Sequence, residues 1–267
     1  MPDVVPLVAD AARTYLDRLG PARSGKTPEA TRRLRVAVRK LRALLELNPL
    51  TEAGPTKALK HTGHRLGELR DWQVLAARVE ALVQDDPTLA PARRAVRIPL
   101  RAAGVAWLAW RQDKAHRHLL KALTKLAGSG ADVSTWQLTE ALLDQALLLV
   151  AAARTVAADD CHANWHQVRL AGKKLRYLIE LAGPRLPGLE PLLMALLGLQ
   201  STLGRLQDID RGIVLLEELA QEDEVAAEAL RRVAARMALE LPEVLAGAEV
   251  PLRAVMKALA ETLGAPR

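Results

Sequence analysis

The sequence predicts an all-α protein, and three observations lead to that prediction. Half of its 267 residues are apolar, and these are mostly Leu, Ala and Val, with no Phe, two Tyr and five Trp, which favours packed helices over sheets. Apolar residues recur at helical spacing, and no stretch alternates over enough residues to predict a strand. Glycine, proline and capping residues divide the chain at helical lengths.

The first half begins with two helices separated by a short loop. Apolar spacing predicts a helix from Val4 to Leu19, which Gly20-Pro21 stops. Thr27 then places a capping hydroxyl before Pro28, a residue suited to the first helical position. The second helix that starts there is expected to close at Asn48-Pro49.

Two longer helices complete the first half. One is expected to begin near Pro55 and to run through Val83 to the turn at 85–87. The next runs from Pro91 to Ala127, and Pro99 should kink or interrupt it because an internal proline removes a helical hydrogen bond. The segment 128–130, Gly-Ser-Gly, is the best linker in the chain.

The same plan is expected again beyond the linker. Helices are predicted over Trp136–Ala157, Asp160–Ala182, Leu189–Leu219 and Glu222–Leu263, the last interrupted at Pro242 and Pro251. The chain is therefore predicted to hold two tandem four-helix repeats, 1–130 and 131–267, whose short loops favour antiparallel neighbours.

A cationic stripe runs along the predicted second helix. Its members stand at i, i+3, i+7 and i+10, over about 15 Å of helix axis: Arg32, Arg35, Arg39 and Arg42. A second set, at i, i+4, i+7 and i+11, lies on a face turned away from the arginines: Leu34, Val38, Leu41 and Leu45. The helix can therefore bury its leucines while the guanidinium groups stay together on the other side.

The stripe recurs half a chain later. Its counterparts lie 134 residues further on, at His166, Arg169, Lys173 and Arg176. Between 35–47 and 169–181, eight of thirteen positions are identical. This match indicates an internal duplication with one stripe in each copy.

The stripes point to an anionic ligand. A single arginine-rich face is more often an ordinary solvated surface, but this one recurs although residues 135–267 carry 14 Lys and Arg against 18 Asp and Glu. Residues 1–134 carry 24 against 13, and the whole chain has a net charge of +7. Neighbouring guanidinium groups repel one another unless an anion lies among them, and their forked geometry suits phosphate.

Two further basic sets have helical spacing. One comprises Lys57, Lys60, His61 and His64, and the other Lys114, Arg117, Lys121 and Lys125. The counterparts of the first set in the second half are not basic. A solvated charged face is the stronger interpretation for both sets, and phosphate binding is the alternative.

Signatures of catalysis and of metal binding are missing. His162 and His166 lie i, i+4 beside Cys161, but no carboxylates converge on them to complete a metal site. The chain has no glycine-rich phosphate loop, no HExxH and no GxSxG sequence. We therefore expect no catalytic residue, no metal and no cofactor. Asp71 and Asp208 match each other within the repeat, and both are interpreted as partners of the arginine rows or as packing anchors.

The sequence favours a cytoplasmic protein. Its single cysteine excludes an intramolecular disulfide, and the N-terminus lacks the pattern of a signal peptide. The longest apolar run, Ala146 to Ala153, is far shorter than the roughly 20 residues of a membrane span. No membrane association is expected.

These motifs resemble the CHAD family, the conserved histidine α-helical domain. The family's stripe pattern stands here as His166, Arg169, Leu170, Lys173, Lys174, Leu175 and Arg176, and in the first copy as Arg35, Val36, Arg39, Lys40, Leu41 and Arg42. Its second-helix pattern stands as Leu66, Gly67, Arg70 and Asp71, and more weakly as Leu203, Gly204, Gln207 and Asp208. Arg32 occupies the place of the family's first histidine.

The resemblance implies both an architecture and a ligand. It implies two four-helix bundles related by a pseudo-two-fold axis, with basic helices facing a central cleft or pore. It also implies non-catalytic binding of inorganic polyphosphate and association with polyphosphate granules. The expected polyphosphate-binding residues are Arg32, Arg35, Arg39, Lys40, Arg42, Lys57, Lys60, His64, Arg117, His166, Arg169, Lys173, Lys174 and Arg176.

Two other functions remain open from the sequence. A nucleic-acid-binding helical protein would make similar phosphate contacts. Aromatic platforms for stacking bases are scarce, however, and no helix-turn-helix is evident. A structural protein that coats granules through a basic adhesion patch is the other alternative.

Overall fold

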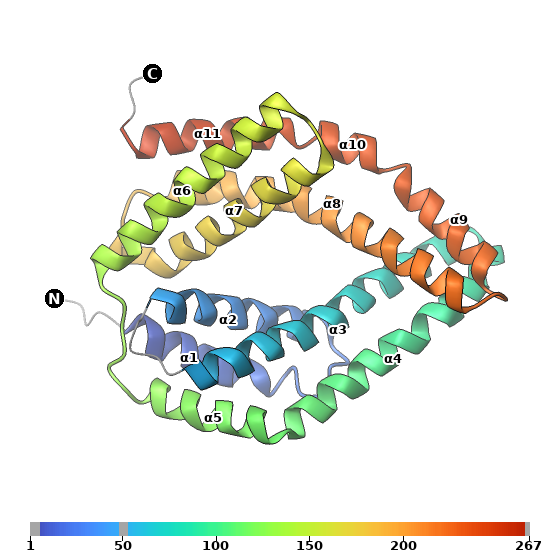
Figure 1. Cartoon of the computed structure of the whole chain (residues 1–267), viewed down its shortest axis with the longest axis horizontal. Helices are drawn as coiled ribbons and strands as arrows, with labels where there is room; N and C mark the ends of the chain where they lie inside the picture. Colours follow the sequence, from blue (N-terminus) through green and yellow to red (C-terminus); the bar gives the residue numbers. More distant parts are fainter. Residues whose placement is uncertain (1–5, 48–52, 265–267) are drawn as a thin grey trace. The chain divides into compact units, whose positions relative to one another are not determined.

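The computed structural model describes residues 6–47 and 53–264, and every regular element in these ranges is a helix (Figure 1). This confirms the all-α prediction. The expected helix start at Val4 and the expected stop at Asn48-Pro49 lie outside the described residues.

The helices follow the predicted order, with more breaks than expected. The first group comprises α1 (Leu7–Leu19), α2 (Pro28–Leu47), α3 (Ala53–Asp85), the 3-10 turn η1 (Pro87–Leu89), α4 (Ala90–Gln112) and α5 (Lys114–Ala127). The second comprises α6 (Thr135–Ala158), α7 (His162–Ala182), the 3-10 turn η2 (Gly183–Arg185), α8 (Glu190–Glu222), α9 (Ala227–Ala238), α10 (Leu241–Ala246) and α11 (Glu249–Thr262).

The predicted helix from Pro91 to Ala127 breaks at a different place than expected. The helix α4 continues through Pro99 and ends at Gln112. Asp113 takes an extended backbone, and its carboxylate accepts a hydrogen bond from the backbone N–H of Ala115 at 2.7 Å. The break therefore results from an aspartate cap that starts a new helix, α5, and not from the proline.

The terminal helices break close to the predicted prolines. Pro242 and Pro251 lie in the first turns of α10 and α11, where a missing N–H costs no intrahelical hydrogen bond. The capping residue Ser134 starts α6 by accepting from Gln137 N while the Gln137 side chain accepts from Ser134 N.

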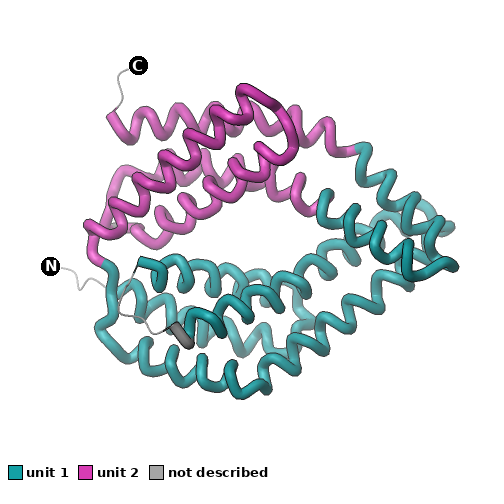
Figure 2. The backbone as a smooth tube through the Cα atoms, in the orientation of Figure 1, with its two compact units in different colours: residues 1–133, 210–239 teal, residues 134–209, 240–267 magenta. Residues whose placement is uncertain are grey.

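Packing divides the chain into two compact units (Figure 2). Unit 1 comprises 1–133 and 210–239, and unit 2 comprises 134–209 and 240–267. Segment 210–239 packs with unit 1 because α9 contacts α4 and η1. The predicted repeats 1–130 and 131–267, their pseudo-two-fold symmetry and the central cleft or pore stay predictions.

The core of unit 1 is built around α2 and α3. The helix α2 packs against α1 and α3, and α3 also packs against α4 and α5. The leucine face of α2 is buried as predicted, with Leu34, Val38 and Leu41 fully enclosed. Its arginines are consequently directed away from the core.

In unit 2 the helix α6 packs along α7, and α11 contacts α6. Within the described ranges, α6 is the one helix whose length and composition would suffice to cross a membrane, with a mean hydropathy of 1.5 over 18 residues. The length of the uninterrupted apolar run Ala146–Ala153 did not reveal this property of α6, because an 18-residue stretch that is apolar on average can include two charged residues. A third of that window is buried within the protein, and a core helix of a soluble protein meets the same criterion.

Candidate functional site

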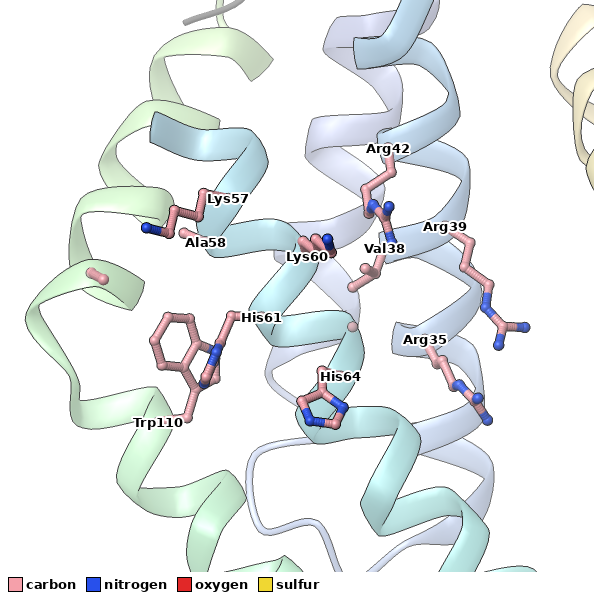
Figure 3. Close-up of a pocket in the computed structure, with 12 residues that line it drawn as sticks. Arg35, Val38, Arg39, Arg42, Lys57, Ala58, Lys60, His61, His64 and Trp110 are labelled. Carbon is pink, nitrogen blue, oxygen red and sulfur yellow. The ribbon is translucent and has the colours of Figure 1, made fainter. Parts of the chain in front are cut away.

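A groove of about 930 Å³ in unit 1 brings three arginines of the first stripe together with the whole basic set of Lys57, Lys60, His61 and His64 (Figure 3). Its walls come from α2, from α3 and from the junction of α4 with α5. The lining residues are Arg35, Val38, Arg39, Arg42, Lys57, Ala58, Lys60, His61, Gly63, His64, Trp110 and Ala115.

The wall from α2 carries three arginines at one-turn intervals (Figure 3). All three, Arg35, Arg39 and Arg42, are half-buried. Gly63 lets α3 approach this wall closely, since a Cβ at that position would lie 3.3 Å from a methyl group of Val38. The close approach places the basic side chains of the two helices around one groove.

Asp71 neutralises part of this wall. Its carboxylate lies 3.7 Å from Arg35 Nη1 and 3.8 Å from Arg211 Nε. Burial raises the pKa of Asp71 above its ordinary value, although the neighbouring arginines act in the opposite direction. The prediction that Asp71 is a partner of the arginine row is confirmed.

The wall from α3 carries cations whose environments differ. Lys57, Lys60 and His64 are exposed, whereas His61 is half-buried with its ring centroid 4.2 Å from that of Trp110. Arg65 Nε donates a hydrogen bond to His61 Nε2 at 3.3 Å. Burial, with contributions from Arg65 and His64, lowers the pKa of His61, so the free groove holds this imidazole neutral at pH 7.

A buried polar network supports the third wall. Trp110 Nε1 donates to Thr62 Oγ1 at 3.0 Å, which fixes the indole against α3. The fully buried His116 lies at hydrogen-bond distance from Arg111 O (3.2 Å) and from the Tyr15 hydroxyl (3.3 Å). Because a carbonyl only accepts, Nδ1 of His116 carries the proton and Nε2 accepts from the tyrosine. Burial lowers the pKa of His116 and keeps it neutral.

Sequence reasoning missed Trp110 and Ala115 as lining residues. Both lie beside the break at Asp113, which the predicted continuous helix did not contain. An aspartate followed by a new amphipathic run was the signal that could have located this wall.

Three of the expected binding residues in unit 1 do not line the groove. Arg32 instead binds Glu29 with two hydrogen bonds of 2.7 and 2.8 Å, and Arg33 binds the same carboxylate. These hydrogen bonds lower the pKa of Glu29 to about 2. Lys40 lies on α2 outside the lining, and Arg117 donates to the backbone carbonyl of Gln112 at 3.0 Å.

The second stripe belongs to unit 2 and lies along α7. Its expected binding residues are His166, Arg169, Lys173, Lys174 and Arg176. His166 and Lys174 are exposed, while Arg176 lies 3.5 Å from Glu180 and over the ring of Tyr177. In unit 2, therefore, two of the five side chains extend into solvent and one is held by neighbours on its own helix.

The family of this chain follows from a comparison with models of known protein families. A family model described as the CHAD domain matches residues 7–217. The chain belongs to the CHAD domain family. This confirms the resemblance inferred from the stripe motifs, and the family is linked to polyphosphate.

Solved structures support the same assignment. The CHAD domain from the plant Ricinus communis shares 24% sequence identity with a TM-score of 0.78, covering 98% of this chain and 90% of that one. PptA from Streptomyces chartreusis shares 21% identity with a TM-score of 0.68, covering 95% and 96%. At these identities the likeness shows the fold. No curated protein matches the chain.

Proposed function

We propose that this CHAD domain binds inorganic polyphosphate through the groove of unit 1. One observation carries the proposal: seven side chains that are cationic, or can become so, line a single groove of about 930 Å³. They are Arg35, Arg39, Arg42, Lys57, Lys60, His61 and His64. Among the described residues, Lys57 and Lys60 have no ion-pair partner, so their charges are available to a ligand.

A linear polyanion suits this arrangement better than a single phosphate. The arginines of α2 follow one another at about 5.4 Å along the helix axis, so one chain of phosphates can meet several of them at once. Each contact adds a charge-assisted hydrogen bond and releases counterions. Once one phosphate is bound, the next contact forms at a high effective concentration.

The proposal includes the absence of catalysis. Phosphoryl transfer normally requires carboxylates that hold magnesium against the phosphates. The groove lining contains no Asp or Glu, and the described residues contain no group of three His, Cys, Asp or Glu side chains that could hold a metal ion. We also propose that the protein acts in the cytoplasm, at polyphosphate granules.

The stripe of α7 is proposed as a second set of phosphate contacts. His166 and Lys174 are its exposed members, and Gly172 lets α7 lie close to α8, where a Cβ would come within 3.1 Å of Gln200 Nε2. Gln200 also donates to the backbone carbonyl of Arg169 at 3.2 Å. These two contacts connect the middle of the α7 stripe to Gln200 of α8.

A titration with polyphosphates of graded length at two salt concentrations tests the proposal. We expect affinity to rise with chain length until the groove is filled, and log affinity to fall steeply with log salt. Equal affinity for orthophosphate and long polyphosphate, or a shallow salt dependence, would contradict it.

Competition with duplex DNA tests the nucleic-acid alternative. Trp110 is the only Trp, Tyr or Phe of the groove lining. Its ring is covered by the tilted ring of His61, and its indole N–H is hydrogen-bonded to Thr62, so it is a poor platform for a base. We expect long polyphosphate to displace DNA at equal phosphate concentration. Displacement in the opposite direction would favour the nucleic-acid function.

A further inference from the structure

One face of α6 is exposed along its whole length. The opposite face is buried against unit 2 through residues such as Leu138, Leu149 and Val156. The exposed stripe has the spacing of a helix seam, at i, i+4, i+7, i+11, i+15, i+18 and i+22. Its residues are Trp136, Glu140, Leu143, Leu147, Ala151, Arg154 and Ala158.

The apolar part of this stripe is large for a solvent-facing surface. Trp136 is 74% exposed and Leu147 67%, Leu143 is also exposed, and Leu148 beside the stripe is exposed as well. Large apolar side chains gathered on one helix face mark a contact surface, because their exposure to water is unfavourable. The composition of the stripe identifies what covers it.

The stripe is self-complementary about Leu147. Four residues before and after it stand Leu143 and Ala151, a large and a small side chain. Seven residues before and after it stand Glu140 and Arg154, an acid and a base. Eleven residues away stand Trp136 and Ala158, again large and small. Two such helices that run antiparallel, with a two-fold axis at Leu147, place each side chain against its complement.

We propose that α6 forms an antiparallel pair with α6 of a second copy of this chain. Leu147 meets its own counterpart on the axis, and Glu140 of each copy pairs with Arg154 of the other. Within the described residues, neither Glu140 nor Arg154 makes an ion pair, so both charges can pair with a second copy of the chain. A parallel pair would instead oppose glutamate to glutamate, and a lipid bilayer would have to bury both charges.

The oligomeric state of the full-length chain tests the pairing. Sedimentation velocity over a range of concentrations should show the mass rise from the 29.0 kDa of one chain to twice that value. Leu147→Glu should keep the protein monomeric, since it places two like charges on the axis. Met194→Glu is the matched control, because Met194 is also 67% exposed but lies on α8, and it should leave the dimer intact.

A charge swap tests the register. Glu140→Arg and Arg154→Glu should each weaken dimerisation at least tenfold, and the double variant should restore it. Restoration is expected only if the two residues face each other across the pair. A double variant as weak as the single ones would overturn the proposed register.

Cysteine cross-linking tests the direction of the helices in a Cys161→Ser background. Leu147→Cys should form a disulfide-linked dimer under mild oxidation. Trp136→Cys should not, because the two cysteines would lie about 33 Å apart along an antiparallel pair. Cross-linking of both variants would indicate a parallel pair and overturn the proposal.

A monomer at all concentrations would also overturn the proposal. So would a monomer that co-sediments with vesicles of phosphatidylcholine and phosphatidylglycerol and loses this association in the Leu147→Glu variant, because the stripe would then be a membrane contact. None of these outcomes depends on polyphosphate binding.

Discussion

The guanidinium of Arg35 lies 3.7 Å from the carboxylate of Asp71, so the first arginine of the groove is held by the second helix of the same groove. Arg211, in the second half of α8, approaches the other oxygen of this carboxylate at 3.8 Å. Asp71 therefore positions Arg35 but also cancels part of the positive charge that a polyanion would meet.

Asp71→Asn should tighten polyphosphate binding. The amide keeps the size of the side chain and removes one negative charge beside the groove, so affinity should rise severalfold at low salt. Asp17→Asn, at an exposed position of α1, makes the same change in net charge and should have a much smaller effect. Equal effects would mean that only the net charge of the protein matters.

The same substitution should cost little stability. The raised pKa of Asp71 means that its carboxyl group binds a proton more tightly in the folded state than in the unfolded state. Its contribution to folding is therefore complete below the unfolded pKa and is lost as the pH rises through the folded pKa. A neutral amide should change the free energy of unfolding at pH 7 by less than about 1 kcal/mol. Urea unfolding of the two proteins measures this difference.

Replacing Arg39, Arg42, Lys57 and Lys60 by alanine should weaken polyphosphate binding tenfold or more. All four line the groove, and alanine is the best helix former, so the helices should remain intact. The slope of log affinity against log salt should become shallower by roughly three, at about 0.7 for each lost contact. Fluorescence titration at several salt concentrations measures both quantities.

The matched control replaces Arg18, Arg94, Arg101 and Arg231, which are exposed positions of unit 1 outside the groove lining. Both quadruple variants have the same net charge. The control should lose far less affinity, and an equal loss in the two would leave the groove without a special role.

The exposed members of the α7 stripe should contribute separately. We expect His166→Ala combined with Lys174→Ala to weaken binding of long polyphosphate, since both side chains extend from α7 into solvent. His118→Ala with Lys257→Ala changes the same residue types at exposed positions outside both stripes. A loss no greater than in this control would restrict the binding site to unit 1.

Binding should strengthen as the pH falls. In the free protein, burial and Arg65 lower the pKa of His61, so this imidazole is neutral at pH 7. A bound phosphate chain favours the charged form and raises the pKa of His61 again, so binding takes up a proton. Affinity should increase as the pH falls through the pKa that His61 has in the complex. It should level off below the pKa that His61 has in the free protein.

His61→Gln should flatten that pH profile, because glutamine cannot take up a proton. Calorimetry in buffers of different ionisation enthalpy measures the proton uptake directly. A wild-type affinity that is constant between pH 5 and 8 would contradict the role of His61.

Asp86 should stabilise unit 1 through its contacts with α9. Its carboxylate accepts hydrogen bonds from Arg232 at 2.9 Å and from Arg236 at 2.6 Å. Hydrogen bonds from Thr88, and more weakly these arginines, lower the pKa of Asp86. The stabilisation is therefore present above the unfolded pKa and is lost as the pH falls through the folded pKa.

Asp86→Asn should lower the melting temperature at pH 7 by a few degrees, and the difference from wild type should close in acid. Asp85→Asn is the adjacent control, at an exposed position that ends α3. A difference that persists unchanged at pH 2 would show that the carboxylate charge is not the cause.

Local sequence was sufficient for the helices and for much of the stripe. The spacing of Leu34, Val38 and Leu41 identified the buried face of α2, and the same period placed Arg35, Arg39 and Arg42 on the opposite face. These predictions succeeded because helical periodicity depends on residues within a few positions of one another. The motif spacing was also enough to identify the CHAD family.

The tertiary structure decided which cations share a groove. Trp110 reaches Thr62 across 48 residues of sequence, and no local pattern indicates that contact. Arg32 belonged to the predicted stripe, yet its guanidinium binds the carboxylate of Glu29. Glu29 lies three residues earlier on the same helix face, so its carboxylate occupies the guanidinium donors that a phosphate would otherwise use.

Tertiary packing also decided the limits of the units. Asp86 binds Arg236 across 150 residues of sequence, and this contact helps to hold segment 210–239 in unit 1. The sequence by itself determined the helices and the faces that they bury, because periodicity is local. Only the folded chain determined which helix faces meet. Those contacts join residues that are far apart in sequence, and no local sequence pattern indicates them.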